Sequence, residues 1–133
     1  MSGAEARYSR FRSGMMAQED VMKKIEAILK PDKIDLVREK LEEAGFNGIS
    51  LIDMMGHGKQ KGITQEWNGE SYRIELLPKV KLEMIVNYQD VDKIISIIKS
   101  SARTGGIGDG KIFVSEIAEA YRIRNDETGE AAL

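Results

Sequence analysis

The order of periodic segments from residue 22 onward predicts an α+β domain, in which two helices cover one face of a four-stranded antiparallel sheet. Apolar and polar residues alternate in four segments, as they do in strands, and apolar residues recur at helical spacing in two others. The strands are expected at 24–29, 49–55, 80–86 and 112–117, and the helices at 31–44 and from about residue 90. The order β-α-β-β-α-β is that of a ferredoxin-like sandwich.

The first strand and the first helix have well-defined faces and ends. Three apolar residues of the strand share one face: Ile25, Ala27 and Leu29. Pro31 is suited to the opening of the helix, and Gly45 is suited to its end. The apolar stripe of this helix consists of Ile34, Val37, Leu41 and Ala44.

A long connection separates the second strand from the third. The alternation that begins at Ile49 ends at Met55, directly before Gly56-His57-Gly58. Residues 56–79 carry mixed charges, two further glycines and a proline, so we expect them to form a loop. A loop of this length inside a compact domain is normally functional. The third strand then presents Val80, Leu82, Met84 and Val86 on one face.

The sheet face away from the helices is predicted to be apolar. The second helix directs Val91, Ile94, Ile95 and Ile98 inward. Both crossover helices therefore cover the same face, and in a monomer the other face should be polar. That other face instead carries an apolar residue on every strand: Ile28, Ile52, Ile85 and Phe113. An uncovered apolar face indicates self-association, so we expect an oligomer.

Size and composition exclude several classes of protein. The 133 residues suit one domain, assigned to 22–133, and 1–21 lack either periodicity and are expected to be a disordered extension. A net charge of −2 gives no global field for nucleic acid. No apolar run is long enough for a membrane helix, so no direct membrane insertion is expected. The chain has no cysteine and a single histidine, His57, which argues against thiolate or histidine metal sites.

The glycine-rich stretch from Arg103 to Lys111 is the strongest candidate for a binding site. Four of its nine residues are glycine, and its ends are cationic. Glycines expose backbone N–H groups that can line an anion-binding concavity. The stretch matches the first seven positions of a G-x-x-x-x-G-K phosphate loop, but Ile112 replaces the Ser or Thr that would hold magnesium, and a strand follows instead of a helix. Phosphate binding without NTP hydrolysis is favoured over a solvated turn.

Several motifs resemble the PII nitrogen regulatory signal transduction family. The family's C-terminal signature is matched by Thr104-x-x-x-Gly-Asp-Gly-Lys-Ile-Phe-Val114. Further matching segments stand at the family's relative spacings: Lys23-Lys-Ile-Glu-Ala-Ile28, Gly58-Lys-Gln-Lys-Gly62, Leu77-Pro-Lys-Val-Lys-Leu-Glu83, Arg122-Ile-Arg124 and Glu127-Thr-Gly-Glu130. The resemblance extends without gaps over residues 22–133 and leaves only the N-terminal extension outside it.

This resemblance implies a homotrimer of ferredoxin-like subunits that binds ATP or ADP in clefts between neighbours. The glycine-rich stretch from Arg103 to Lys111, called the glycine run below, would bind the phosphates. Residues 118–133 would close over the nucleotide. With Mg²⁺ and ATP bound, the family binds 2-oxoglutarate and reshapes a long T-loop, here 58–76, that contacts target proteins. An ammonium transporter or a nitrogen-assimilation enzyme is a candidate target. The implied location is the cytoplasm, with recruitment to the membrane by such a transporter.

The resemblance also assigns roles to particular residues. The residues implied for nucleotide binding are Ser50, Gly58, Lys59, Gln60, Glu83, Ile85, Arg103, Gly108, Asp109, Gly110, Lys111, Arg122 and Arg124. Those implied for 2-oxoglutarate are Gly58, Lys59, Gln60, Lys61, Gly62, Lys79 and Gly108, with Gln60 as the magnesium ligand. Chemically, guanidinium groups suit phosphate oxygens. Arg122 and Arg124 share one side if their segment is extended, and a surface ion-pair ladder is the alternative reading of this pair.

The tip of the T-loop departs from the family pattern. Tyr72 stands where some bacterial members are nucleotidylated, so it is a candidate modification site, but its sequence context is altered. Glu70 replaces the serine that cyanobacterial members phosphorylate, and Asn68 replaces the basic residue that some members insert into an ammonium channel. Ligand sensing is therefore better supported by the sequence than any modification or named target.

Two other classes of function remain open at this point. A nucleotide-hydrolysing enzyme would need a general base near the γ-phosphate, and no nucleophile–base pair is visible in the sequence. We therefore expect no catalytic residues and no enzymatic activity. A ferredoxin-like trimer that binds metals or amino acids would leave the cations of the glycine run and the 122/124 arginine pair without a purpose.

Overall fold

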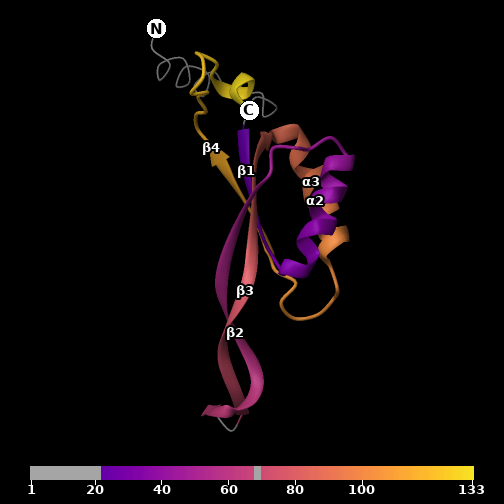
Figure 1. The fold of residues 1–133 in the computed structure, drawn as a ribbon, viewed down its shortest axis with the longest axis vertical. Coiled ribbons are helices and arrows are strands. Elements are labelled where there is room, and N and C mark those ends of the chain that lie inside the picture. Colours follow the sequence, from indigo (N-terminus) through magenta and orange to yellow (C-terminus); the bar gives the residue numbers. More distant parts are fainter. Residues whose placement is uncertain (1–21, 68–69) are drawn as a thin grey trace, which may run out of the picture.

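The structure, a computed structural model, describes residues 22–67 and 70–133, and it describes side chains in these ranges except at 58–75. Its four strands form one antiparallel sheet in the order β2-β3-β1-β4. The strands are β1 (Met22–Leu29), β2 (Ser50–Trp67), β3 (Glu70–Asn87) and β4 (Lys111–Ile117). Helices α2 (Ile34–Glu43) and α3 (Val91–Ala102) lie together on one side of the sheet (Figure 1). The predicted α+β, ferredoxin-like fold is confirmed, whereas the expectation for residues 1–21 lies outside the described residues.

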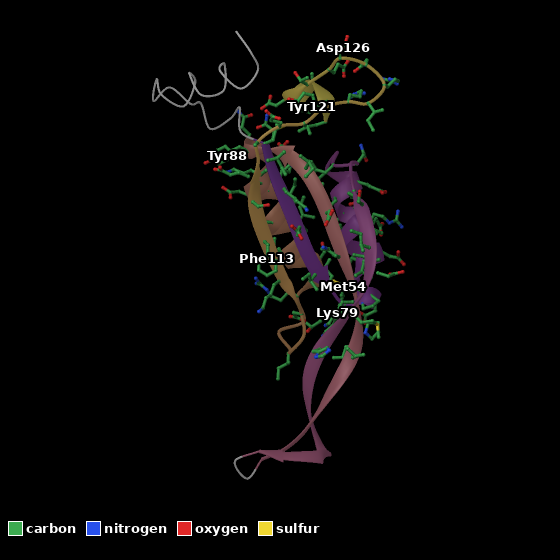
Figure 2. The ribbon with its side chains drawn as sticks, turned by 90° about the vertical axis from the view of Figure 1, so that its left-hand side faces the viewer. Met54, Lys79, Tyr88, Phe113, Tyr121 and Asp126 are labelled. Carbon is green, nitrogen blue, oxygen red and sulfur yellow. The ribbon has the colours of Figure 1, made fainter. Side chains whose placement is uncertain are left out.

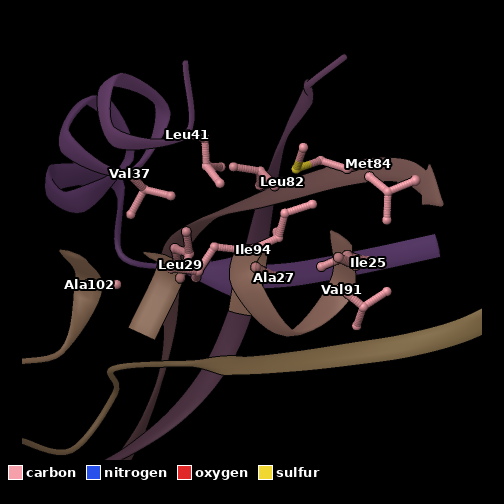
Figure 3. Packing of buried hydrophobic residues seen from close by; sticks show 12 residues of the cluster. Ile25, Ala27, Leu29, Val37, Leu41, Leu82, Met84, Val91, Ile94 and Ala102 are labelled. Carbon is pink, nitrogen blue, oxygen red and sulfur yellow. The ribbon is translucent and has the colours of Figure 1, made fainter. Parts of the chain in front are cut away.

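The core lies between the helices and one face of β1 and β3, as the periodicity predicted. The predicted inward set of β1 is at most 2% exposed, and that of β3 is at most 8% exposed. Val37 and Leu41 of α2 and Ile94 and Ile98 of α3 pack against these strands (Figure 3). Their burial stabilises the fold by roughly 1.5–3 kcal/mol per large side chain.

Short 3₁₀ turns precede both helices and set their starts. One turn, Pro31–Lys33, leads into α2, and another, Tyr88–Asp90, leads into α3. The side chain of Asn87 accepts a hydrogen bond from the Gln89 N–H and so caps the second turn. Gly45 follows α2 at a φ of 92°, which confirms that a glycine ends this helix.

The prediction of a loop at 56–79 is wrong. Strands β2 and β3 continue through this region as one antiparallel arm, paired from Ser50 opposite Glu83 out to Trp67 opposite Glu70. The register shifts between Lys61 and Gln65. The arm projects away from the helices and the rest of the sheet (Figure 1). Sequence alternation ends at Gly56 because the arm leaves the core there, but backbone pairing needs no apolar face to continue.

The sheet face away from the helices is open, as predicted, and carries both apolar and charged side chains. Ile28 is half-buried, and Ile52, Ile85 and Phe113 are 36–51% exposed. Figure 2 views this face, with the strands in front of the helices and Phe113 labelled on β4. Four ion pairs of 3.3–3.6 Å join the side chains of Lys24, Glu26, Lys81 and Glu83, two of them within a strand and two between β1 and β3. These four side chains together carry no net charge.

The glycine run is packed tightly against the end of β1. Lys111, where β4 begins, pairs with Ile28 of β1. Gly110 has a φ of 104°, and a Cβ atom at this position would overlap the carbonyl oxygen of Ile28. Only glycine therefore allows the run to approach β1 this closely.

We predict that Gly110→Ala lowers the free energy of unfolding more than Gly45→Ala does. Both substitutions place a side chain at positive φ, which costs about 1–2 kcal/mol. Gly45 has open space around the added Cβ, whereas Gly110 adds the overlap with Ile28. Denaturant titration of both variants measures the difference. Equal losses of stability would contradict the close packing of the run on β1.

Candidate anion-binding site at the glycine run

The run begins where α3 ends and leads into β4, near the base of the arm (Figure 1). Arg103 is the C-terminal cap residue of α3, in an extended conformation. Gly105, Gly108 and Gly110 all have positive φ values, of 85–104°. These backbone conformations favour glycine and account for the glycine density that marked the stretch in the sequence.

The carboxylate of Asp109 is turned into the run and holds its first half. The backbone N–H groups of Thr104 and Gly105 each donate to Asp109 Oδ2 at 2.9 Å. The Thr104 hydroxyl donates to Asp109 Oδ1 at 2.5 Å and accepts from the Gly106 N–H at 3.1 Å. The Thr104 hydroxyl and amide, helped by Gly105 and Lys30, hold the pKa of Asp109 well below its usual range. Asp109 is therefore an anion already bound within the run.

This arrangement narrows the set of donors that a ligand can use. The N–H groups of residues 104, 105 and 106 are engaged inside the run. Backbone donors for an external anion must therefore come from 107–111. The expected contributions of Gly108, Gly110 and Lys111 remain possible in this geometry, and Asp109 could contribute only its backbone N–H.

Two lysines converge on the run from neighbouring strands. Lys79 of β3 donates from Nζ to the carbonyl oxygen of Gly108 at 3.0 Å. Lys30, directly after β1, places its Nζ 3.5 Å from Asp109 Oδ1. Lys79 was expected near the ligand, but sequence reasoning missed Lys30. The antiparallel pairing of β1 with β4 was the available signal, because it brings the end of β1 beside the start of β4.

An open pocket of about 250 Å³ lies on the side of the run that faces α3. It combines apolar lining from Leu29, Ile98 and Ile112 with polar groups from α3 and the run. The cations on its lining are Lys99, Arg103 and Lys111. Lys99 had not been expected there. Both residues that bracket the run in the sequence line this pocket, although the alternation of β4 directs the Lys111 side chain to the open sheet face.

The residues expected around the adenosine group lie on the open sheet face. Ser50 pairs with Glu83 across β2 and β3, and Ile85 follows two residues along β3 on the same face. Glu83 belongs to the charged set described above, through ion pairs with Lys24 and Lys81. The same face continues to Lys111 through Glu26 and Ile28 of β1. The open face therefore connects the two predicted halves of the nucleotide site within one subunit.

The expected 2-oxoglutarate residues Gly58, Lys59, Gln60, Lys61 and Gly62 lie in β2, within the arm. Gly58 pairs with Glu75 and Gln60 with Arg73. The structure describes their backbone but not their side chains, so the assignment of Gln60 to magnesium stays a prediction. Tyr72 pairs with Lys61 and Gln65 at the register shift.

The segment that carries Arg122 and Arg124 is not extended, so the condition under which the two side chains would share one side is not met. Tyr121 bridges to Thr128, and residues between them bend back. The Arg122 guanidinium forms an ion pair with Glu127, from Nε to Oε2 at 3.0 Å. Its Nη2 atom also donates to the carbonyl oxygens of Ala131 and Leu133, at 3.2 and 3.4 Å. A turn stabilised by these contacts replaces the extended conformation.

The two sets of predicted phosphate-binding cations lie at opposite ends of β4. The glycine run enters β4 at Lys111, and the C-terminal segment leaves it after Ile117. The intervening strand spans about 20 Å at ~3.3 Å per residue. Figure 2 shows Tyr121 and Asp126 at one end of the sheet and Lys79 well away from them, where the arm begins. One subunit therefore does not bring Arg122 or Arg124 to its own glycine run.

Neither metal clusters nor membrane helices occur among the described residues. Among the side chains that the structure describes, at 22–57 and 76–133, no three from His, Asp or Glu gather in a way that could hold a metal ion. No helix in the described part of the chain is long and apolar enough to cross a bilayer.

Comparison with known proteins agrees with this geometry. The description "Nitrogen regulatory protein P-II" belongs to the family whose sequence model matches residues 22–127. A nitrogen regulatory protein P-II of Rhodobacter capsulatus is 54% identical over 84% of this chain and 100% of its own. Nitrogen regulatory protein P-II 2 of Methanothermobacter thermautotrophicus is 48% identical over 84% of this chain and 97% of its own.

Two solved structures share the fold along most of their length. The B. subtilis GlnK–ATP complex superimposes with a TM-score of 0.73 and 31% identity, over 86% of this chain and 99% of the other. Arabidopsis thaliana PII bound to citrate superimposes with a TM-score of 0.70 and 34% identity, over 85% and 92%. The family description is that of a regulator, which confirms the expectation of a regulatory protein rather than an enzyme. The chain belongs to the nitrogen regulatory protein P-II family.

Proposed function

We propose that the chain is a homotrimeric sensor that binds ATP or ADP between subunits and, with Mg²⁺ and ATP, also binds 2-oxoglutarate. The bound ligands would set the conformation of the arm at 58–76, which contacts a target protein. An ammonium transporter is the target class carried over from the family resemblance. The protein would then act in the cytoplasm and be recruited to the membrane by the transporter.

The separation of the predicted phosphate cations is the observation that carries this proposal. Arg103 and Lys111 lie at one end of β4, and Arg122 and Arg124 follow its other end. A second copy that contacts the open sheet face can bring its C-terminal arginines to the first copy's glycine run. Cyclic repetition of this contact closes a ring, and three copies form the ring implied by the family resemblance.

The open face has the chemistry needed for contact with another copy. Its apolar residues flank a charged set with no net charge, so a neighbour can cover it without burying an unpaired ion. In a site between copies, the Arg122 guanidinium would serve a neighbour's ligand. Within its own subunit it contacts Glu127 and a C-terminal carbonyl oxygen. Phosphates would replace these contacts when the neighbour supplies them.

The chemistry of the glycine run fits phosphate groups. Backbone donors from 107–111 and the cations of the pocket suit the oxygens of a di- or triphosphate. Lys79, which donates to the Gly108 carbonyl at the base of the arm, would supply the charge for a carboxylate ligand there. The similar structures support both ligand classes, since one is an ATP complex and another is bound to citrate.

We predict that the full chain has a trimer mass in solution and that Phe113→Glu lowers it. A glutamate on the open face would place an unpaired charge in the contact between copies. Leu36→Glu is the matched control, because Leu36 is 42% exposed but lies on α2, outside that face. Light scattering at micromolar concentration measures both variants. A monomeric wild-type chain, or a Phe113→Glu variant that remains trimeric, would contradict the proposed contact.

We predict that 2-oxoglutarate binds only together with Mg²⁺ and ATP, and that it tightens ATP by the same factor, of about 5–150-fold. Gln60→Ala should remove this coupling and leave ADP affinity nearly unchanged, while Gln65→Ala, farther along the arm, should keep both. Lys111→Ala should weaken ATP and ADP alike, by about 1.5–3 kcal/mol. Calorimetry on these variants measures each affinity. Tight 2-oxoglutarate binding to Gln60→Ala without nucleotide would show that the acid binds elsewhere.

A further inference from the structure

Protein groups hold both oxygens of the Asp109 carboxylate. An ionised carboxylate offers about four lone-pair sites on its two oxygens. Oδ2 accepts from two backbone N–H groups, and Oδ1 accepts from the Thr104 hydroxyl and lies 3.5 Å from Lys30 Nζ. Three of its lone-pair sites thus accept hydrogen bonds from the run and a cation lies beside the fourth, although the motif places this side chain in the phosphate-binding stretch.

The partners of Asp109 tie three separate parts of the chain together. Thr104 starts the run after α3, Asp109 stands near its end, and Lys30 follows β1. The hydrogen bonds between Thr104 and Asp109 close the intervening residues into a ring, and the Gly106 N–H is held through the Thr104 hydroxyl. Lys30 joins this ring to the strand that forms the centre of the core.

Lys79 fixes the orientation of the next peptide group. Its ammonium group holds the carbonyl oxygen of Gly108 at 3.0 Å. Because the peptide bond is planar and trans, the N–H of Asp109 points in the opposite direction from that carbonyl. The Asp109 N–H is therefore aimed away from Lys79 while the Asp109 side chain faces the ring. The N–H of Asp109 therefore stays available to a ligand, while the carboxylate of Asp109 bonds within the run.

We propose that Thr104, Asp109 and Lys30 form a positioning unit, which shapes the glycine run for an anion while the Asp109 carboxylate itself does not contact the ligand. The identity of that ligand as ATP rests on the proposed function. A bare carboxylate beside a triphosphate would repel it, so the presence of Asp109 here requires a compensating role. Ordering the run before binding is that role, because a pre-ordered site loses less conformational entropy when the ligand binds.

The test compares variants that keep or remove single contacts in the full chain. Thr104→Val removes the hydroxyl, Thr104→Ser retains it, and Asp109→Asn removes the charge at nearly constant shape. Lys30→Met removes the positive charge beside Asp109, and Lys30→Arg retains it. Asp35→Asn is the matched control, because Asp35 has the same chemistry on the exposed surface of α2, 3.7 Å from Arg38. Calorimetry measures ATP affinity, hydrogen exchange reports the 104–106 amides, and thermal melting reports overall stability.

The positioning unit predicts that Thr104→Val weakens ATP about tenfold, as for loss of a hydrogen bond to a charged group. It also predicts faster exchange of the 104–106 amides in that variant without ligand, at an unchanged melting temperature. Thr104→Ser should stay within about twofold of the wild type by the same reasoning. Lys30→Arg should bind ATP more tightly than Lys30→Met does. The Thr104→Val/Asp109→Asn double variant should be no weaker than the weaker single variant, since both substitutions disable one unit.

Three results would overturn the inference. Wild-type ATP affinity in Thr104→Val would show that the ring does not position the run. Additive losses in the double variant would show that Asp109 contacts the nucleotide on its own account. Unchanged exchange of the 104–106 amides in Thr104→Val would overturn the inference without any measurement of ligand binding. If the wild-type chain does not bind ATP, the proposed function fails. Amide exchange in the wild type and in Thr104→Val still shows whether the Thr104–Asp109 hydrogen bonds order the run.

Discussion

The close contact between the glycine run and the end of β1 is the constraint on which the candidate site depends. Gly110 lies against the Ile28 carbonyl, and the next residue, Lys111, already pairs with β1 as the start of β4. Strand β1 is the central element of the core, with Ile25 and Ala27 fully buried. The run is thereby attached to the buried centre of the domain, between the end of α3 and the start of β4. Arg103 at the end of α3 and Lys79 at the base of the arm take their places around it as a consequence.

A second constraint comes from the direction of β4. The strand carries the chain from the glycine run to the C-terminal segment at the opposite end of the sheet, so one subunit has only part of the predicted cation set at either end. The uncovered sheet face between these ends combines apolar residues with a neutral set of ion pairs. Both features are explained by the proposed contact, in which neighbouring copies would complete each other's sites. The base of the arm lies beside the run through Lys79, so a ligand between subunits can be coupled to the arm.

The sequence predicted the parts of the structure that depend on local periodicity and backbone conformation. Alternation at Ile25, Ala27 and Leu29 identified the core face of β1, and Gly45 identified the end of α2. The arm was missed because its strands lie outside the core, where pairing leaves no apolar pattern in the sequence. The turn around Arg122 was missed because it depends on contacts with Glu127 and the C-terminal carbonyl groups. Lys30 and the inward Asp109 carboxylate depend on strand pairing and loop closure, so a motif identifies the stretch but not which atoms of it are free to bind.

The most direct test of the account is a crystal structure of the full chain with Mg²⁺ and ATP. The account predicts that the phosphates contact the backbone N–H groups of 107–111 in one subunit and the Arg122 or Arg124 side chain of a neighbour. It also predicts that the Asp109 carboxylate still accepts from the Thr104 and Gly105 amides in that complex. Phosphates that displace this carboxylate, or that contact cations of a single subunit only, would contradict it.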